Sequence, residues 1–373
     1  MRKKMIMGII VLMILSLFAA CGGSDPSDEQ SGAAGDAAKL TGQIAEIDEY
    51  GHAVLDITAD DFYKAGFELG DIVTVSVGNY KGDMPCFNGF YVDRDEYMVR
   101  VPDEHPTISL CINYGKFAET VGAEAGDPVT IIMKEKAGAL DTQQINDLSY
   151  TDDREDYESD EVFANFRPIK EGRLYRSASP IDNERGRASY ANDLIEAAGV
   201  RSVMNIASTE EEIDQWIAAD DFDSPYYKKL YEDGKVIPLG LPVDFASDEF
   251  GEGIARGLTF LTNSEPPYLV HCNEGKDRAG FGSMILEELM GWNEEEITAD
   301  YMTSYQNYYG VEQGSEKYDL IADKNVKEMM RSVAGLEEGA PLEGVDLKKA
   351  AEDYLKKHGM KAEDLQKLEE TLK

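Results

Sequence analysis

Ten consecutive residues, from His271 to Gly280 (HCNEGKDRAG), carry the clearest chemistry in this chain. Cys272 and Arg278 are separated by five residues, a spacing that suits a loop wrapped around a phosphate dianion. Successive backbone N–H groups of such a loop point inward, and the N-terminus of a following helix adds positive potential. The arginine guanidinium binds two phosphate oxygens at once, and the same donors stabilise a thiolate. Cys272 is therefore expected to act as a nucleophile.

The residues on either side of this loop predict the elements that must position it. Tyr268 to His271 is a short apolar run after two prolines, which is typical of a buried strand. Apolar residues then recur at helical spacing as far as Met290, and Gly291 stands where a helix C-terminal cap belongs. The alternative, in which Cys272 is an ordinary buried thiol, leaves this order of strand, loop and helix to coincidence.

The loop resembles the H-C-x-x-G-x-x-R signature of the cysteine-dependent protein tyrosine and dual-specificity phosphatases. Its Gly-Lys-Asp-Arg form is typical of the bacterial secreted branch that acts on phosphotyrosine and phosphoinositides. The similarity extends over the C-terminal domain, in the segments 174–180, 199–206, 354–360 and 365–372. It implies that Cys272 attacks phosphorus to form a phosphocysteine, while Arg278 stabilises the equatorial oxygens. It assigns phosphate binding to the other loop residues, Asn273, Glu274, Gly275, Lys276, Asp277, Ala279 and Gly280.

The resemblance also requires a carboxylic acid to protonate the leaving oxygen. Asp244 follows a predicted strand 28 positions before Cys272, where the family carries its acid. Asp248 and Glu249 are alternatives on the same predicted loop. Ala279 stands where most of the family has serine or threonine, whose hydroxyl eases breakdown of the phosphocysteine. The second step is therefore expected to limit turnover.

Further charged residues have two interpretations each. Lys276 is expected to add a second cation beside the phosphate and Asp277 to orient Arg278, or both are solvated loop charges. Six basic residues further upstream either line a locally positive mouth or are ion-paired surface residues: Arg167, Lys170, Arg173, Arg176, Arg185 and Arg187.

The first 20 residues predict a signal peptide, which is set aside from the fold. Three basic residues precede an apolar run, and Phe18-Ala19-Ala20-Cys21 resembles the cleavage box of bacterial lipoproteins. In that family the cysteine is diacylated, which implies that Cys21 anchors the mature chain to the outer face of the bacterial cell membrane. A transmembrane helix is the alternative, although the run is short for a full span. Residues 21–38 are expected to form a flexible tether.

The formal net charge of −37 restricts the partners. Nucleic acid is excluded because its binding needs a basic face. A phosphorylated small molecule, lipid or protein is expected as the substrate. The acidity opposes highly anionic substrates, which places phosphotyrosine or phosphoinositides ahead of phytate. The four histidines show no metal-ligand spacing, so we expect neither a metal nor a cofactor.

Residues 39–137 are predicted to form a small β-barrel. The segments 65–74 and 121–130 each place a Gly-Asp turn before an alternating apolar run. The segments 47–57 and 112–119 resemble the C-terminal barrel of the SAM hydroxide adenosyltransferase family, with Tyr-Gly-His where that family has Phe-Gly-Asn. A structural or binding accessory module is therefore expected. Cys86 and Cys111 either form a disulfide or remain buried free thiols.

Residues 138–161 are expected to form an acidic linker, and residues 162–373 an α/β domain. Strands and helices alternate there, which predicts a mostly parallel sheet covered by helices, with the loop at the carboxyl end of its strand. The sequence therefore favours a surface-anchored phosphomonoesterase. The alternative is a catalytically weak phosphate-binding or adhesion lipoprotein, in which Ala279 marks a decayed site.

Overall fold

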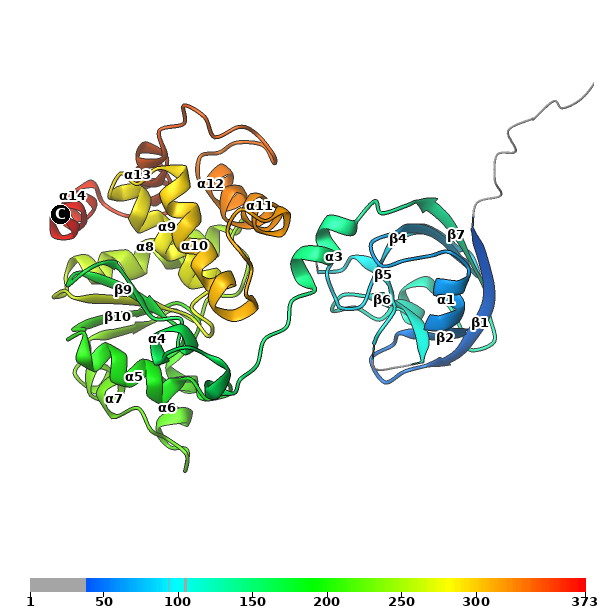
Figure 1. Ribbon diagram of the computed structural model, residues 1–373, viewed down its shortest axis with the longest axis horizontal. Coiled ribbons are helices and arrows are strands. Elements are labelled where there is room, and N and C mark those ends of the chain that lie inside the picture. The colour runs from blue at the N-terminus through cyan, green and yellow to red at the C-terminus, as the bar shows by residue number, and fades with distance from the viewer. Residues whose placement is uncertain (1–37, 93, 104–105) are drawn as a thin grey trace, which may run out of the picture. The chain divides into compact units, whose positions relative to one another are not determined.

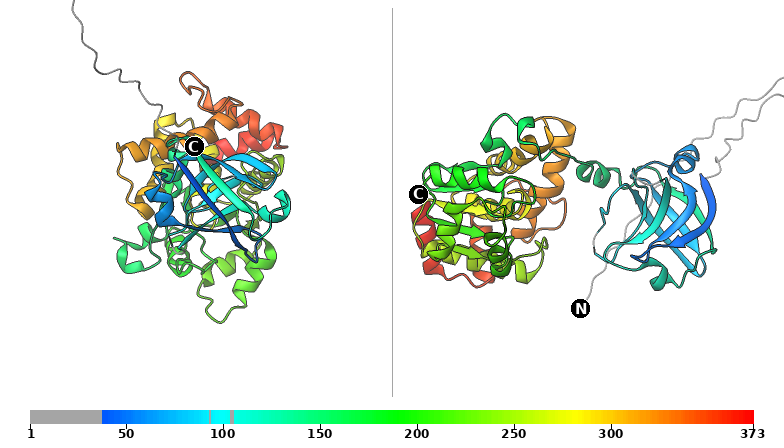
Figure 2. Two further views of the ribbon diagram at one scale, coloured as in Figure 1. Left: turned by 90° about the vertical axis from the view of Figure 1, so that its right-hand side faces the viewer. Right: turned by 90° about the horizontal axis from the view of Figure 1, so that it is seen from below.

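The computed structural model describes residues 38–92, 94–103 and 106–373, which comprise a β-barrel and, later in the chain, an α/β region (Figure 1, Figure 2). The predicted signal peptide, Cys21 and the tether up to residue 37 lie outside the described residues. Within the described ranges, no helix combines the length and the apolar character needed to cross a membrane.

In the described part of the chain, seven strands close into a barrel in the order β1-β2-β6-β5-β4-β3-β7. Neighbouring strands are antiparallel except for β4 and β5, which are parallel. The strands are β1 (Lys39–Ile47), β2 (Ala53–Thr58), β3 (Ile72–Val77), β4 (Tyr80–Phe87), β5 (Tyr97–Arg100), β6 (Thr107–Ile112) and β7 (Pro128–Glu135). Three short helices accompany them within the described ranges: α1 (Ala59–Lys64), α2 (Phe117–Val121) and α3 (Leu140–Asn146).

The two similar segments of the sequence lead into the paired strands β3 and β7. Each contains a glycine at positive φ, 86° at Gly70 and 93° at Gly126, a conformation that glycine adopts at low cost. The aspartates that follow, Asp71 and Asp127, each accept the backbone N–H of the residue three positions earlier. The two strands then pair antiparallel. The prediction of a small barrel is confirmed.

Two of the three free cysteines of the described residues lie on barrel strands, Cys86 in the barrel core and Cys111 in a separate apolar cluster with Phe87 and Met98. Cys86 and Cys111 are both buried and unpaired, so the free-thiol alternative holds. Burial raises the pKa of both thiols, that of Cys111 to about 12.

The α/β region contains a five-stranded sheet in the order β11-β10-β12-β9-β8. The three pairings from β11 to β9 are parallel, and β8 joins the edge antiparallel. The strands are β8 (Arg167–Lys170), β9 (Leu174–Ser177), β10 (Ser202–Asn205), β11 (Val236–Pro238) and β12 (Tyr268–His271).

Helices cover both faces of this sheet (Figure 1). Alternate residues of the central strands enter two different cores, as a pleated strand requires. Met204 and Val270 pack with α8, α9 and α13, whereas Val203 and Leu269 pack with α5, α6 and α7. The helices are α4 (Asp160–Phe163), α5 (Ala188–Ala197), α6 (Glu210–Ile217), α7 (Pro225–Glu232), α8 (Asp248–Thr262), α9 (Asp277–Leu289), α10 (Glu294–Tyr309), α11 (Glu316–Ala322), α12 (Glu328–Val333), α13 (Leu347–Lys357) and α14 (Ala362–Leu372), with a 3-10 turn η1 (Arg154–Asp156) and a π-helical turn η2 (Asp323–Lys327).

The predicted strand, loop and helix around Cys272 are confirmed as β12, a connecting loop and α9. Gly291 follows α9 with φ of 81°, as expected of a C-terminal cap. The sequence pattern predicts a helix from Gly253 to Thr262, and helix α8 begins five residues earlier, at Asp248. The reason is the Ser247 side chain, which accepts the N–H of Phe250 and caps the helix.

Candidate active site

The loop between β12 and α9 places Cys272 at the carboxyl end of the central strand, where its side chain is 3% exposed. Gly275 has φ of 70° and lies against the end of β9. A Cβ atom at this position would lie 2.3 Å from the carbonyl oxygen of Ser177. The tight loop therefore requires glycine there.

Three side chains hold the loop from outside by donating hydrogen bonds to its carbonyl oxygens. Arg176 Nη2 donates to Gly275 O and Lys276 O at 2.8 and 3.1 Å. Asn165 Nδ2 donates to the carbonyl oxygens of Glu274 and Gly275, and the Tyr308 hydroxyl also donates to Glu274 O, at 2.8 Å. Because the carbonyls are held outward, the backbone N–H groups are left to face the pocket, as anion binding requires.

A buried ion cluster fixes Arg176 in turn. Asp300 accepts hydrogen bonds from Arg176 Nη1 at 2.5 Å and from Arg167 Nε at 2.7 Å. Burial alone would raise the pKa of Asp300, but the two guanidinium groups hold it well below its usual range. Nearby, burial and the Asp300 charge raise the pKa of Glu287. The two arginines therefore share one ionised carboxylate.

His271 is buried before the loop and belongs to a small polar chain. Its Nε2 lies 3.3 Å from the Tyr227 hydroxyl, which also accepts from Asn205 Nδ2 at 3.0 Å. Burial lowers the pKa of His271 to about 3. The imidazole is therefore neutral near pH 7, and it supports the strand end without adding charge beside Cys272.

The Arg278 guanidinium is fixed by acceptors on two elements. Its Nη1 donates to Leu241 O at 2.8 Å, and its Nη2 donates to Asn273 Oδ1 at 3.0 Å. Leu241 lies on the loop that joins β11 to α8. The arginine is thus tied both to the loop between β12 and α9 and to the neighbouring loop that carries Asp244.

Cys272 and Arg278 line the same pocket, which has a volume of about 270 Å³. Three arginines and four carboxylates face it. Its lining residues are Asp182, Glu184, Arg185, Arg187, Val243, Cys272, Asn273, Glu274, Asp277 and Arg278.

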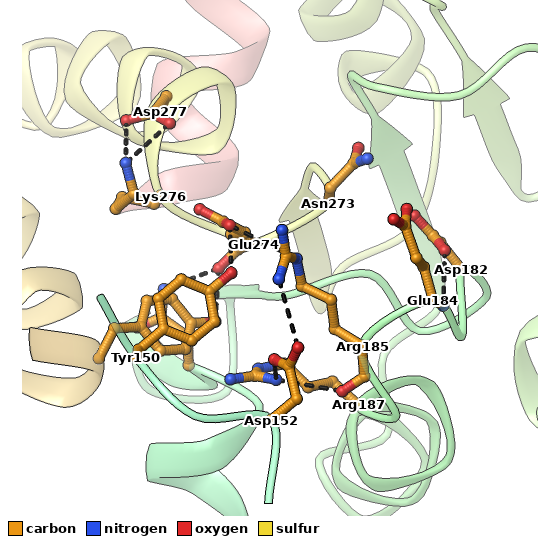
Figure 3. A network of polar contacts seen from close by, with 12 residues as sticks. Tyr150, Asp152, Asp182, Glu184, Arg185, Arg187, Asn273, Glu274, Lys276 and Asp277 are labelled. Atoms are coloured by element: carbon orange, nitrogen blue, oxygen red, sulfur yellow. Dashed lines mark hydrogen bonds and ion pairs between the residues drawn. The ribbon is translucent and has the colours of Figure 1, made fainter. Parts of the chain in front are cut away.

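The chain before α4 packs against the mouth of this pocket (Figure 3). The Tyr150 hydroxyl donates to the Glu274 carboxylate, and its ring stacks on Tyr308 with centroids 5.0 Å apart. Asp152 pairs with Arg187 at 2.7 Å and with Arg185 at 3.3 Å. Part of the segment predicted as a linker therefore contacts the loop between β12 and α9.

Arg187 holds this segment in place from a buried position. Its guanidinium lies against aromatic rings, nearest to Phe163 at 4.3 Å from the ring centroid, and also against Tyr308 and Tyr157. Its Nη2 donates to the carbonyl oxygen of Thr151. Because its cation is enclosed by aromatic rings and by Asp152, Arg187 acts as a packing element at the mouth of the pocket.

Lys276 turns away from the pocket. Its Nζ donates to both carboxylate oxygens of Asp277, at 2.7 and 2.9 Å, and lies 5.0 Å from the ring centroid of Tyr305 (Figure 3). Although burial acts against the charged form, Asp277 raises the pKa of Lys276 well above its usual value. Asp277 is thus bonded to Lys276, while Arg278 is oriented by other groups.

The predicted acid, Asp244, lies on the exposed loop between β11 and α8 and is not part of the pocket lining. Its neighbour Val243 does line the pocket. Asp248 points elsewhere, with its carboxylate 3.6 Å from Lys357 Nζ. Asp182 faces the pocket, and burial raises its pKa. Ala279 is fully buried in the first turn of α9.

For the basic residues upstream of the loop, the structure favours the ion-pair interpretation. Arg185 and Arg187 line the pocket, and both are paired with Asp152. Arg167 and Arg176 are buried behind the loop on Asp300. Lys170 and Arg173 are not among the pocket-lining residues.

Several residues of the site carry no motif that would reveal them in the sequence. Tyr150, Asp152, Asn165, Asp300 and Tyr308 lie between 28 and 122 positions from Cys272 along the chain. Asn165 and Asp300 act on the loop through hydrogen bonds that depend on tertiary structure. The one signal available was the presence of Arg167 and Arg176 in the strands β8 and β9. Arginine is rarely buried unless it is paired, so arginines in these strands imply a buried acidic partner.

The sequence profile of the tyrosine phosphatase family matches residues 161–373, more than half of the chain. No curated protein matches.

Among solved structures, the chain is similar to an uncharacterized conserved protein of Thermotoga maritima, with 26% identity and a TM-score of 0.24. That similarity covers 25% of this chain and 36% of the Thermotoga protein. The core catalytic domain of the PP-IP phosphatase SIW14 from S. cerevisiae is 19% identical, with a TM-score of 0.26, and the similarity covers 46% of this chain and 91% of that domain. TpbA of P. aeruginosa, in complex with pTyr, is 16% identical, with a TM-score of 0.27, and the similarity covers 43% of this chain and 90% of TpbA. Each TM-score lies below 0.5, so the family profile carries the assignment.

Proposed function

This chain belongs to the tyrosine phosphatase family and is a phosphoric monoester hydrolase, and we propose that it works through a covalent phosphocysteine on Cys272. The observation that carries the proposal is the single pocket lined by both Cys272 and Arg278, on a loop whose carbonyl oxygens are held outward. The inward N–H groups and the guanidinium are the donors that a phosphoryl group needs in the transition state.

In the first step, the Cys272 sulfur attacks phosphorus as the bond to the leaving oxygen breaks. Arg278 and the loop N–H groups bind the equatorial oxygens. Asp244 donates a proton to the leaving oxygen, which departs as an alcohol or phenol. Arg278 is already bonded to Leu241 O, three residues before Asp244. A small movement of that exposed loop would bring the carboxyl over the pocket.

In the second step, water attacks phosphorus and gives a proton to the Asp244 carboxylate, the P–S bond breaks, and inorganic phosphate leaves while the thiolate is restored. Ala279 provides no hydroxyl beside the thiolate, so this step limits turnover. The same feature is what favours the alternative of a catalytically weak phosphate-binding protein. The ordered cage around the loop supports the enzyme instead, because three outside donors support its binding conformation.

The Cys272→Ser variant tests the nucleophile. Turnover of an aryl phosphate should fall by about 10³-fold or more, while binding of vanadate is retained. Cys111→Ser, in the barrel, is the matched control and should keep wild-type turnover. Unchanged turnover in Cys272→Ser would overturn the proposal.

The acid is tested by comparing leaving groups. Asp244→Asn should slow a poor leaving group by about 10²-fold or more and barely affect a good one. Asp182→Asn is the comparison, because Asp182 faces the pocket. A larger, leaving-group-dependent loss in Asp182→Asn would transfer the role to that residue.

The proposed substrates are phosphotyrosine or phosphoinositide monoesters, ahead of phytate. The four carboxylates that face the pocket support this order, because a polyphosphate needs a net positive site to offset its own charge. Specificity constants for a phosphotyrosine peptide, a short-chain phosphoinositide and phytate, measured at one ionic strength, test it. A specificity constant for phytate that exceeds the other two by about tenfold would reverse the order, since a tenfold ratio is a clear difference in free energy.

The proposed location is the outer face of the bacterial cell membrane, through a lipid on Cys21. The basic start, the apolar run and the Phe-Ala-Ala-Cys box support it. Cells supplied with labelled palmitate should incorporate label into the wild-type protein and not into Cys21→Ser. Equal labelling of both proteins would contradict the anchor.

A further inference from the structure

A second recess adjoins the catalytic pocket. It has a volume of about 330 Å³ and lies between the β9–α5 loop and the α6–α7 loop. Asp182 and Glu184 line both cavities, so the two are contiguous. Figure 3 shows these two carboxylates on the far side of Arg185 from Lys276 and Asp277. A substrate whose phosphate enters the pocket would extend its body over this shared wall.

The recess combines aromatic walls with negative charge. Trp216 and Phe222 are half-buried and line it. Asp221 and Asp223 are exposed on the α6–α7 loop and join Asp182 and Glu184 in the lining, which includes neither lysine nor arginine. Aromatic faces beside carboxylates form the setting that binds a long aliphatic side chain with a cationic end.

The negative charge at the shared wall is only partly compensated. Arg185, the arginine nearest in sequence, forms its ion pairs with Asp152 and Glu274. Burial and the charges of Glu184 and Glu212 raise the pKa of Asp182, although the Glu184 N–H and the Arg185 charge act in the opposite direction. A cation in the recess would relieve this repulsion. Lys228 Nζ lies 5.7 Å from the Phe222 ring centroid, and Lys228 is outside the lining of the recess.

We propose that this recess binds a lysine or arginine side chain that flanks the phosphorylated residue of a peptide substrate. The inference rests on the proposed function and names a substrate class for the same site. The methylene stem packs against Trp216 and Phe222, and the cation faces the carboxylates. The net charge of −37 steers basic peptides toward the protein. Inositol polyphosphates have no group to place there.

The first experiment is a lysine scan through the three positions on either side of phosphotyrosine in an otherwise neutral peptide. Norleucine and glutamate at the same positions are the controls. Lysine at the preferred position should raise kcat/KM about fivefold to twentyfold over norleucine, and glutamate should lower it. The preference should shrink with added salt, because exposed charges are screened.

The second experiment uses residues that line the recess and not the catalytic pocket. The double variant Asp221→Asn/Asp223→Asn should lose most of the lysine preference and keep wild-type turnover of a small aryl phosphate, which does not reach the recess. Asp220→Asn, on the same loop and outside the lining, is the matched control. Asp221→Lys/Asp223→Lys should reverse the preference toward glutamate, which a misfolded protein would not do.

The outcomes separate the two proposals. If no phosphate ester is hydrolysed, the proposed function fails. If phosphotyrosine peptides are hydrolysed without a lysine preference, or if the preference survives in Asp221→Asn/Asp223→Asn, the recess does not bind a basic side chain and this inference is overturned.

Discussion

The β-barrel and the α/β region differ in what they bury. In the barrel, among the described residues up to 137, the core is apolar and the one charged side chain that is buried is Asp71. The α/β region buries Arg176, Arg187, His271 and Lys276 around one loop. Burying charge is costly unless it is paired and hydrogen-bonded. The difference indicates that the second region accepts a cost in stability to fix the loop between β12 and α9, whereas the barrel core is built almost entirely from apolar packing.

The largest effect is expected at Arg278, the pocket-lining arginine that follows Cys272 on the same loop. Arg278→Ala should reduce kcat by about 10³-fold or more with little change in the free energy of unfolding, because the side chain acts on the transition state. Arg256→Ala, on the exposed face of α8, is the control and should leave both quantities unchanged. A large loss of stability in Arg278→Ala would mean that this arginine is structural.

The next prediction compares an ion pair from each region: both partners are buried in Arg176–Asp300, whereas Lys136 is half-exposed beside the buried Asp71. Arg176→Met leaves Asp300 with less compensation and removes two hydrogen bonds from the loop, so unfolding should become easier by about 3–5 kcal/mol, and turnover should fall. Lys136→Met removes the lysine beside Asp71 in the barrel. The free energy of unfolding should fall by only about 1 kcal/mol, because the Asp71 carboxylate still accepts hydrogen bonds from the backbone N–H groups of Ala137 and Glu68.

Denaturant titrations of the two variants, followed by kinetics at a temperature where both are folded, measure this contrast. Equal losses of stability would remove the distinction between the two regions.

A smaller effect concerns pH. His271 has a pKa of about 3 in the folded protein because it is buried, against about 6.5 unfolded. Between these values the unfolded chain binds the extra proton, so the free energy of unfolding falls as pH falls. Acidification from pH 7 to pH 5 should cost about 2 kcal/mol from this group. The free energy of unfolding of His271→Asn should lack that part of the pH dependence. The same slope of this free energy against pH in both proteins would refute the prediction.

The sequence predicted the parts of the fold that repeat or carry a motif. The barrel followed from two Gly-Asp turns, and the loop at Cys272 from its flanking strand and helix. Helix α8 was placed too late because Ser247 caps it ahead of the apolar pattern. The local sequence pattern was sufficient to predict an element wherever its structure depends on residues that are close together in the chain.

The surroundings of the loop could not be predicted because they depend on contacts that are distant in sequence. Asn165, before β8, and Tyr308 of α10 donate hydrogen bonds to the loop. Asp300 of α10 acts on it indirectly, by accepting a hydrogen bond from Arg176. Lys276 was expected beside the phosphate, yet its pairing with Asp277 turns it toward Tyr305. Residue type predicted the charges but not their partners.

The central claim is that Cys272 carries the phosphoryl group during turnover. The most direct measurement is rapid acid quenching of the wild-type enzyme during hydrolysis of an aryl phosphate, followed by digestion and mass spectrometry of the peptide that contains Cys272. The mechanism predicts a burst of phenol equal to the enzyme concentration and one phosphoryl group on Cys272, because Ala279 slows breakdown of the intermediate. Phenol release that is linear from the first turnover, with Cys272 unmodified throughout, would contradict it.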